Sequence, residues 1–198
     1  MPSTLRPYHP SDLPGMYRVC LLTADAGADA TALYRDPDLV GHVYLGPYPT
    51  SDPGLSFVVQ DDEGIAGYIV GTADTAAFDA WADEHWWPVL RQRYPLRDDP
   101  RDGTADHLLA QRVHGLDRDE APAGYPAHLH IDLLPRIQGQ GWGRRLISAF
   151  TDELRRRGVP GVHLRVDERN LGARAFYTRL GFAPDEDDVW LLPLGSRG

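Results

Sequence analysis

The stretch QGQGWGRR, residues 138–145, follows the apolar run HLHIDLLP, residues 128–135, and decides the fold. Its glycines stand at alternate positions, where they leave backbone N–H groups accessible, and a pair of arginines follows at once. Strand, glycine loop and helix is the layout in which the N–H groups and dipole of a helix N-terminus bind phosphate. The stretch therefore predicts an anion site, with a plain glycine-rich turn as the alternative.

Two nucleotide-binding loops differ from this one. A Walker loop, GxxxxGK[ST], needs a lysine, and the chain has none. A dinucleotide-binding GxGxxG needs a third glycine where Arg144 or Leu146 stands. Asp167 follows the next strand, where a ribose-binding acid would lie, but too few residues remain after it to complete such a sheet. Both nucleotide readings are therefore disfavoured.

Hydrophobic periodicity predicts the elements on either side of the loop. Near the N-terminus we expect a strand over residues 3–12 that ends at the helix-start signal Ser11-Asp12, and then a helix with apolar residues at helical spacing. The remaining expectations are a short helix and a Pro/Gly-rich loop in 36–54, a hairpin of 55–60 and 65–74, strands over 127–135, 161–167 and 188–194, and helices over 141–158 and 170–182.

Residues of about 75–125 change the pattern. The segment 76–95 is aromatic and helical in period, RDDPRDG (97–103) is a polar break, and 104–115 predicts a second helix. The region is too small for a large core of its own. We therefore expect one domain over residues 1–198 with a Trp-rich helical insertion.

Composition excludes several classes of function. The chain has 198 residues, a net charge of −9 and a pI of about 5.2, which disfavours nucleic acid and anionic membranes as partners. One cysteine excludes an internal disulfide, and neither a leader segment nor a membrane-spanning stretch is evident. We therefore expect a cytoplasmic protein. The absence of lysine also excludes Schiff-base chemistry.

Two motifs resemble those of the Gcn5-related N-acetyltransferases (GNAT). The pattern Gln138-x-x-Gly141-x-Gly143 is similar to their coenzyme A signature, Q/R-x-x-G-x-G/A. The segment VDERNLGARAFYTRLGF, residues 166–182, resembles their second motif, with the only asparagine of the chain, Asn170, at a helix start. Gly181 would cap this helix, and Phe182 would pack behind it.

A wider resemblance joins segments 36–41, 63–74, 84–95 and 125–135 to the acetyltransferase-like C-terminal domain of O-GlcNAcase and its free-standing bacterial relatives. The eukaryotic domain lacks the glycine signature, whereas this chain retains it. The resemblance implies an α/β (α+β) GNAT fold. Its central mixed, mostly antiparallel sheet of six to seven strands would be splayed at the acetyl-CoA site, with helices on both faces and the insertion before the fourth strand.

The resemblance also implies an activity and a cofactor site. Acetyl-CoA would be the co-substrate, no metal would be needed, and acetyl would pass to a primary amine by direct attack in a ternary complex. Leu133 N–H would polarise the acetyl carbonyl, and Leu134 would pair with the pantetheine amides. The full implied cofactor set is Leu133, Leu134, Gln138, Gly139, Gln140, Gly141, Trp142, Gly143, Arg144, Asn170, Ala173, Phe176 and Tyr177.

Acid and base candidates come from two elements. Tyr177 would protonate the departing thiolate, although its place in an apolar helical stripe also suits a core residue. Strand alternation sends His128, His130 and Asp132 to one face, and either His130 or Asp132 could take a proton from the amine. Plain hydrogen-bonded sheet residues are the alternative for both.

Other readings remain open at this point. HLHID fits the start of a zinc-hydrolase ligand run, H-x-H-x-D, but the next ligand would fall on Leu133. An acetyl-CoA-binding or partner-docking module without catalysis is a second alternative. We expect the acceptor to be a small-molecule or peptide amine, and the protein to be a monomer or a homodimer. The aromatic residues of the insertion wall a pocket or form a small core or dimer contact; they are Phe78, Trp81, Trp86, Trp87 and Tyr94.

Overall fold

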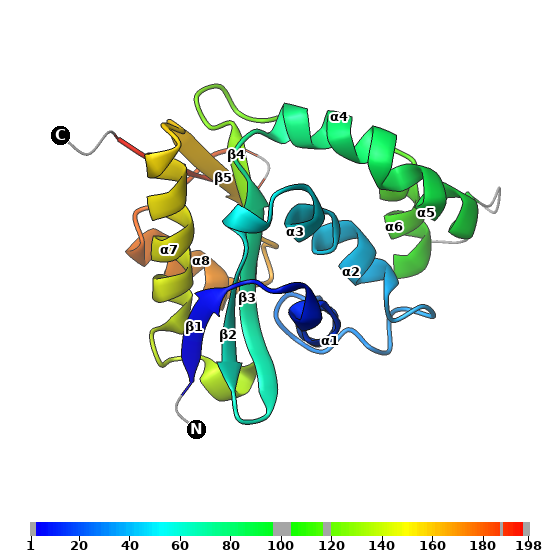
Figure 1. Cartoon of the computed structure of the whole chain (residues 1–198), viewed down its shortest axis with the longest axis horizontal. Coiled ribbons are helices and arrows are strands. Elements are labelled where there is room, and N and C mark those ends of the chain that lie inside the picture. Colours follow the sequence, from blue (N-terminus) through cyan, green and yellow to red (C-terminus); the bar gives the residue numbers. More distant parts are fainter. Residues whose placement is uncertain (1–2, 97–103, 117–119, 187, 196–198) are drawn as a thin grey trace.

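A seven-stranded mixed sheet forms the centre of the molecule (Figure 1). The computed structural model describes residues 3–96, 104–116, 120–186 and 188–195. The strands run in the order β1-β2-β3-β4-β5-β7-β6. Their bounds are β1 Thr4–Pro7, β2 Phe57–Asp61, β3 Gly64–Thr72, β4 Ala127–Leu133, β5 Gly161–Arg165, β6 Ala183–Pro184 and β7 Val189–Pro193.

All strand pairs but one are antiparallel. The hairpin of β2 and β3 is confirmed, and β3 pairs with β4 over six residue pairs. In contrast, β4 and β5 run parallel and share only the pairs Ala127↔Val162 and His128↔His163 before they diverge. The expected GNAT fold, with its mixed, splayed sheet, is therefore confirmed, and the insertion does precede the fourth strand.

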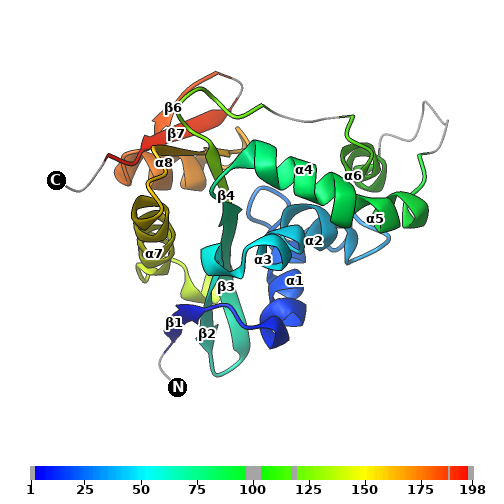
Figure 2. The same ribbon diagram turned by 45° about the horizontal axis from the view of Figure 1, so that its top comes forward.

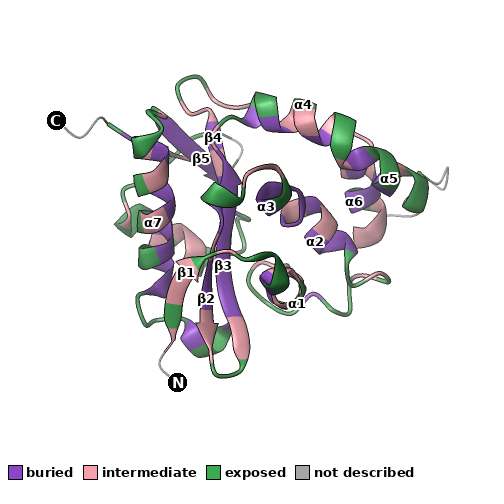
Figure 3. Ribbon diagram, in the orientation of Figure 1, coloured by how far each residue is buried: buried purple, intermediate pink, exposed green. Residues whose placement is uncertain are grey.

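One face of the sheet is covered by α7 (Trp142–Arg156) and α8 (Leu171–Arg179), as Figure 2 shows. Helix α7 buries one stripe, including Leu146, Phe150 and Leu154, against the alternate apolar residues of the strands. Figure 3 shows this buried stripe facing the sheet and the exposed stripe facing away from it. Such a helix is stable because its apolar face is removed from water.

The remaining helices cover the opposite face. Helix α1 begins at Leu13, directly after Asp12 as predicted, although the Asp12 side chain makes no cap hydrogen bond to it. Met16, Val19 and Cys20 of α1 are buried there with Tyr68 of β3. The bounds on this face are α1 Leu13–Leu21, α2 Leu39–Tyr44, α3 Pro47–Ser51, α4 Thr75–His85, α5 Trp87–Arg93 and α6 Ala105–Val113, and the short 3-10 turns of the chain are Pro10–Asp12, Pro53–Leu55 and Pro135–Ile137.

The insertion packs into this second core. Phe78, Trp87 and Leu109 from α4, α5 and α6 are buried in the same apolar cluster as Met16 of α1. The predicted aromatic helix is split in two at Trp86, because Pro88 lies in the first turn of α5 and cannot continue α4. The predicted polar break, residues 97–103, lies outside the described residues. The treatment of 1–198 as one domain stays a prediction.

Three local expectations were wrong. The N-terminal strand ends at Pro7, and a 3-10 turn separates it from α1. The expected Pro/Gly-rich loop contains helix α3, because Pro47 stands in the first turn, where no N–H donor is needed. The short strand β6, which pairs with β7, was not predicted.

Among the helices that the structure describes, none combines the length and the apolar character needed to cross a membrane.

Trp87 tests whether the insertion shares the core. Trp87→Ala should lower the free energy of unfolding by about 3–5 kcal/mol, because a buried indole is removed. Val89→Ala, on the same helix at 69% exposure, should change it by less than about 0.5 kcal/mol. Urea unfolding followed by circular dichroism checks both. If unfolding instead showed two transitions, and Trp87→Ala shifted only one of them, residues 75–125 would fold as a unit of their own.

Candidate functional site

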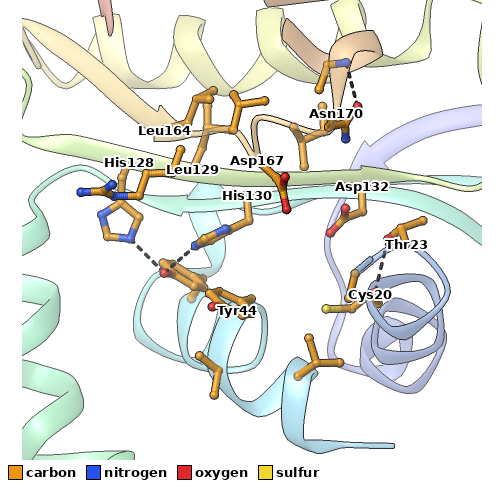
Figure 4. Close-up of a pocket in the computed structure, with 18 of the residues that line it drawn as sticks. Cys20, Thr23, Tyr44, His128, Leu129, His130, Asp132, Leu164, Asp167 and Asn170 are labelled. Atoms are coloured by element: carbon orange, nitrogen blue, oxygen red, sulfur yellow. Dashed lines mark hydrogen bonds between the residues drawn. The ribbon is translucent and has the colours of Figure 1, made fainter. Parts of the chain in front are cut away.

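A cavity of about 500 Å³ opens beside β4 at the place where β5 diverges. Figure 4 shows His128, His130 and Asp132 projecting from β4 toward the helices that carry Tyr44 and Cys20. Residues of α8, including Tyr177, complete the lining. The predicted alternation of β4 is confirmed, because Leu129, on the other face, lies in the core under α7.

The end of β4 offers free backbone groups. Leu134 N–H donates to Ala66 O of β3 at 2.8 Å. Neighbouring residues of an antiparallel strand point their N–H groups to opposite sides, so Leu133 N–H points away from β3. On that side the pairing with β5 has already ended. Leu133 N–H therefore faces the opening, as its predicted role requires, whereas Leu134 N–H is already used within the sheet.

The glycine loop presents a run of backbone donors. Gly139 and Gly141 have φ values of 72° and 84°, in the left-handed region that glycine adopts without strain. Within the described residues, no backbone acceptor is found for the N–H groups of 139–144. Gln138 and Gln140 brace the loop, since their side-chain amides donate to Leu133 O and Arg136 O, each at 2.8 Å. The loop thus has the free N–H groups of an anion cradle.

Gly143 joins three elements. A Cβ atom there would lie 2.8 Å from Cζ of Phe176 and 3.2 Å from Cδ1 of Leu133. The start of α7, the end of β4 and α8 are therefore in contact at this residue. The Trp142 side chain is buried in the core, so only its backbone reaches the loop surface, and the Arg145 guanidinium lies 4.5 Å from the centre of its ring.

The second motif folds as expected at both ends of α8. Asn170 Oδ1 accepts a hydrogen bond from Ala173 N–H at 3.0 Å and so caps the helix. At the other end, Gly181 is left-handed and Phe182 is buried behind it, as predicted. Gly181 N–H and Phe182 N–H donate to Thr178 O and Tyr177 O, which is a Schellman cap.

Tyr177 lies between core and cavity. Its ring contacts Phe176, Phe182 and Trp190, as the apolar stripe predicted. Among the described residues its hydroxyl has no hydrogen-bond partner, and the side chain lines the cavity. Burial, and to a smaller extent the nearby Asp132 carboxylate, raises the pKa of Tyr177, so the hydroxyl keeps its proton. It can therefore donate a proton into the cavity.

The two histidines of β4 share one partner. Tyr48 of α3 places its hydroxyl 2.9 Å from Nε2 of both His128 and His130. Burial lowers the pKa of His128 well below its ordinary value. Burial, with Arg112 and His163 nearby, lowers the pKa of His130 to about 3. Both imidazoles are therefore neutral near pH 7.

Asp132 is held by the neighbouring strand. Its Oδ2 accepts a hydrogen bond from the Tyr68 hydroxyl of β3. Burial raises the pKa of Asp132, an effect partly offset by the hydrogen bond from Tyr68 and by the nearby Thr23 hydroxyl. The same burial, and the charge of Asp132, raise the pKa of the Cys20 thiol, which also lines the cavity. The carboxylate of Asp132 therefore has a higher pKa than a free carboxylate and is the more basic acceptor for a proton on β4.

The HLHID stretch does not form a metal-ligand set. Both ring nitrogens of His128 are engaged, with the Tyr48 hydroxyl and with Thr75 Oγ1. Within the part of the chain that the structure describes, no group of three or more His, Cys, Asp or Glu side chains is arranged to hold a metal ion.

Sequence reasoning missed the residues that complete the site from other elements. They are Cys20, Thr23, Tyr48, Tyr68, Thr75, Asp79 and Arg112. No motif marks them, since each reaches β4 only through the packing of the helices and of β3. For the aromatic insertion, the pocket wall and the small core were both predicted, and Phe78 and Trp87 line the cavity as well as packing in the core.

Comparison with known proteins identifies the family. The model of the "Acetyltransferase (GNAT) family" matches residues 28–182. The crystal structure of SsHAT is 38% identical, superposes with a TM-score of 0.90, and is matched over 99% of this chain and 100% of that one.

Two curated proteins are also similar. Protein O-GlcNAcase of Rattus norvegicus is 23% identical over 182 residues, 90% of this chain and 20% of that protein. A mycothiol acetyltransferase of Renibacterium salmoninarum is 36% identical over 156 residues, 73% of this chain and 45% of that protein. The chain thus spans about a fifth of the first and under half of the second.

Proposed function

This chain belongs to the GNAT family of acetyltransferases, and on that premise we propose that it transfers acetyl from acetyl-CoA to a primary amine. The amine would attack directly within a ternary complex. The observation that carries this proposal is the convergence at the open end of β4. Leu133 directly follows the cavity residue Asp132, the glycine loop contacts Leu133 and α8 through Gly143, and Tyr177 of α8 lines the cavity.

The residues around the loop would hold the coenzyme. The N–H groups of 139–144 suit the pyrophosphate, and the exposed Arg144 adds positive charge beside them. Gln138, Gln140 and Trp142 would support the loop, while Asn170, Ala173 and Phe176 would position α8 against it. For Leu134, only the carbonyl remains for a pantetheine amide, because its N–H is bound to Ala66 O.

The chemistry follows from three groups. Asp132 accepts a proton from the ammonium form of the acceptor, which leaves an amine lone pair. As the C–N bond forms, Leu133 N–H stabilises the negative charge on the acetyl oxygen. When the C–S bond breaks, Tyr177 O–H protonates the departing thiolate, and the second proton, which the attacking nitrogen loses as the amide forms, restores the tyrosine hydroxyl. Asp132 and Tyr177 both line the cavity, so no proton has to cross the core.

The cavity also limits the acceptor. Asp79, Asp132 and Asp167 line it together with Arg112 and the ring of Tyr44. Carboxylates favour a cationic group, and aromatic walls favour the methylenes or ring that carry it. We therefore propose a small-molecule or peptide amine as the acceptor.

Binding of the coenzyme is the direct test. Calorimetric titration should show that acetyl-CoA binds, and that Gly141→Ala weakens binding because alanine is strained at φ 84° and distorts the donor run. Gly158→Ala, with φ 73° and open space at the other end of α7, should leave binding unchanged. A panel of amines read by thiol release then tests transfer. No binding would refute the proposal, and binding without release on any amine would favour a binding module.

Tyr177→Phe tests the acid. The variant should bind acetyl-CoA normally, because the ring and its packing remain, but turnover should fall at least ~10-fold. Tyr17→Phe, which removes a partly buried hydroxyl outside the cavity, should keep normal turnover. Steady-state thiol release compares them. Equal turnover of Tyr177→Phe and the parent protein would rule out this role.

The pH profile distinguishes the two candidate bases. A base acts when deprotonated, so kcat/KM should rise with pH through its pKa. If Asp132 is the base, this rise lies above the ordinary carboxyl pKa of 3.8 and disappears in Asp132→Asn. If His130 is the base, the rise lies near pH 3. A rise that survives both His130→Ala and Asp132→Ala would exclude both residues.

A further inference from the structure

Four hydrogen bonds link the start of the insertion to the cavity in one line. Thr75 Oγ1 donates to Pro126 O at 2.8 Å and lies 2.8 Å from Nδ1 of His128. The other ring nitrogen of His128 lies 2.9 Å from the Tyr48 hydroxyl, which in turn lies 2.9 Å from Nε2 of His130. The line runs from a backbone carbonyl to a histidine that borders the cavity.

The first bond fixes the direction of all the others. A carbonyl oxygen can only accept, so the single hydroxyl proton of Thr75 must lie between Oγ1 and Pro126 O. Thr75 Oγ1 can then only accept from His128, which places a proton on Nδ1 of His128. Because neutral imidazole carries one N–H, His128 Nε2 is unprotonated and accepts from Tyr48. Tyr48 has no second proton, so its oxygen accepts from Nε2–H of His130.

The last member of the line is therefore determined. Neutral His130 carries its proton on Nε2, and its Nδ1 holds a lone pair. Among the described residues, Nδ1 of His130 has no hydrogen-bond partner. Ser56 Oγ is the only side-chain polar atom among these residues that is both fully buried and without a partner, so Nδ1 of His130 is not fully buried. Nδ1 thus reaches the space of the cavity that His130 lines.

We infer that Thr75, His128 and Tyr48 are positioning residues that fix His130 as the Nε2–H tautomer, so that its Nδ1 accepts a hydrogen bond from the N–H of the acceptor amine. The role of the amine rests on the proposed function, whereas the tautomer does not. His130 then acts as a contact that selects a hydrogen-bond donor, and Asp132 remains the proton acceptor.

The surroundings keep this arrangement in place. The ring of Tyr48 stacks on Phe78 with centroids 4.4 Å apart and planes 8° apart. Phe78 and Thr75 both belong to α4, so one helix orients two members of the line. The groups that face His130 are Tyr48, Tyr44, His128, His163 and Arg112, and the last two disfavour an imidazolium there.

The tautomer can be measured in the free protein. Proton-coupled ¹⁵N NMR of histidine-labelled protein distinguishes protonated from unprotonated ring nitrogens, and His130→Gln assigns the resonances. We expect a protonated Nε2 and an unprotonated Nδ1 for His130, and the reverse for His128. A protonated Nδ1 on neutral His130 would overturn the inference, whatever the activity of the protein.

Thr75 provides a matched pair of variants. Thr75→Val removes the acceptor for His128, so the reversed direction of the line becomes accessible and His130 Nδ1 should shift toward protonation. Thr75→Ser keeps the hydroxyl and should retain the parent spectrum. Tyr17→Phe, which removes the 2.8 Å Tyr17–His42 bond outside the cavity, should leave His130 unchanged. The other histidine resonances report whether each variant is folded.

Kinetics tests the contact itself. With an amine that the parent protein acetylates, Thr75→Val should raise the KM for the amine about 3- to 10-fold, the range of one hydrogen bond, with unchanged acetyl-CoA affinity. Thr75→Ser should restore it. A parent-like tautomer and KM in Thr75→Val would overturn the positioning role. The expected tautomers without transfer to any amine would refute the proposed function and still support the direction of the line.

Discussion

The early separation of β4 from β5 is the constraint on which the site depends. A strand inside a sheet normally spends its N–H and C=O groups on two neighbours. Here the parallel neighbour is lost after His128, while β3 stays paired to the end of β4. The unpaired side of β4 leaves Leu133 N–H available, and the space that β5 vacates becomes the cavity. The proposed cofactor contact and the proposed acceptor cavity are thus two results of one divergence.

The two faces of β4 divide the work between packing and chemistry. Leu129 and its alternate neighbours anchor the strand in the core beneath α7, where apolar burial stabilises the fold. His128, His130 and Asp132 point to the other face, where the two histidines share Tyr48 of α3, His128 also contacts Thr75 of α4, and Asp132 accepts from Tyr68 of β3. Partners from α3, α4 and β3 therefore hold these side chains in orientations that a surface strand could not maintain.

The features that could be predicted from the sequence are the local ones. The glycine loop, the Asn170 cap and the alternation of β4 depend on residues a few positions apart, so their patterns are visible in the chain. The partners of the histidines could not be predicted in this way. Tyr48 lies 80 and 82 residues from His128 and His130, in a segment whose prolines and glycines predicted a loop. Its position results from the packing of α3 under α4, which no short motif encodes.

Burial of Cys20 has a consequence for the fate of a bound thioester. Lysine amines and cysteine thiolates are the side chains that attack thioesters most readily. This chain contains no lysine, and its one cysteine lies where burial and the charge of Asp132 keep the thiol protonated. A thioester bound as proposed would therefore meet no lysine amine and a cysteine whose thiol stays protonated, which disfavours self-acylation over transfer to the acceptor.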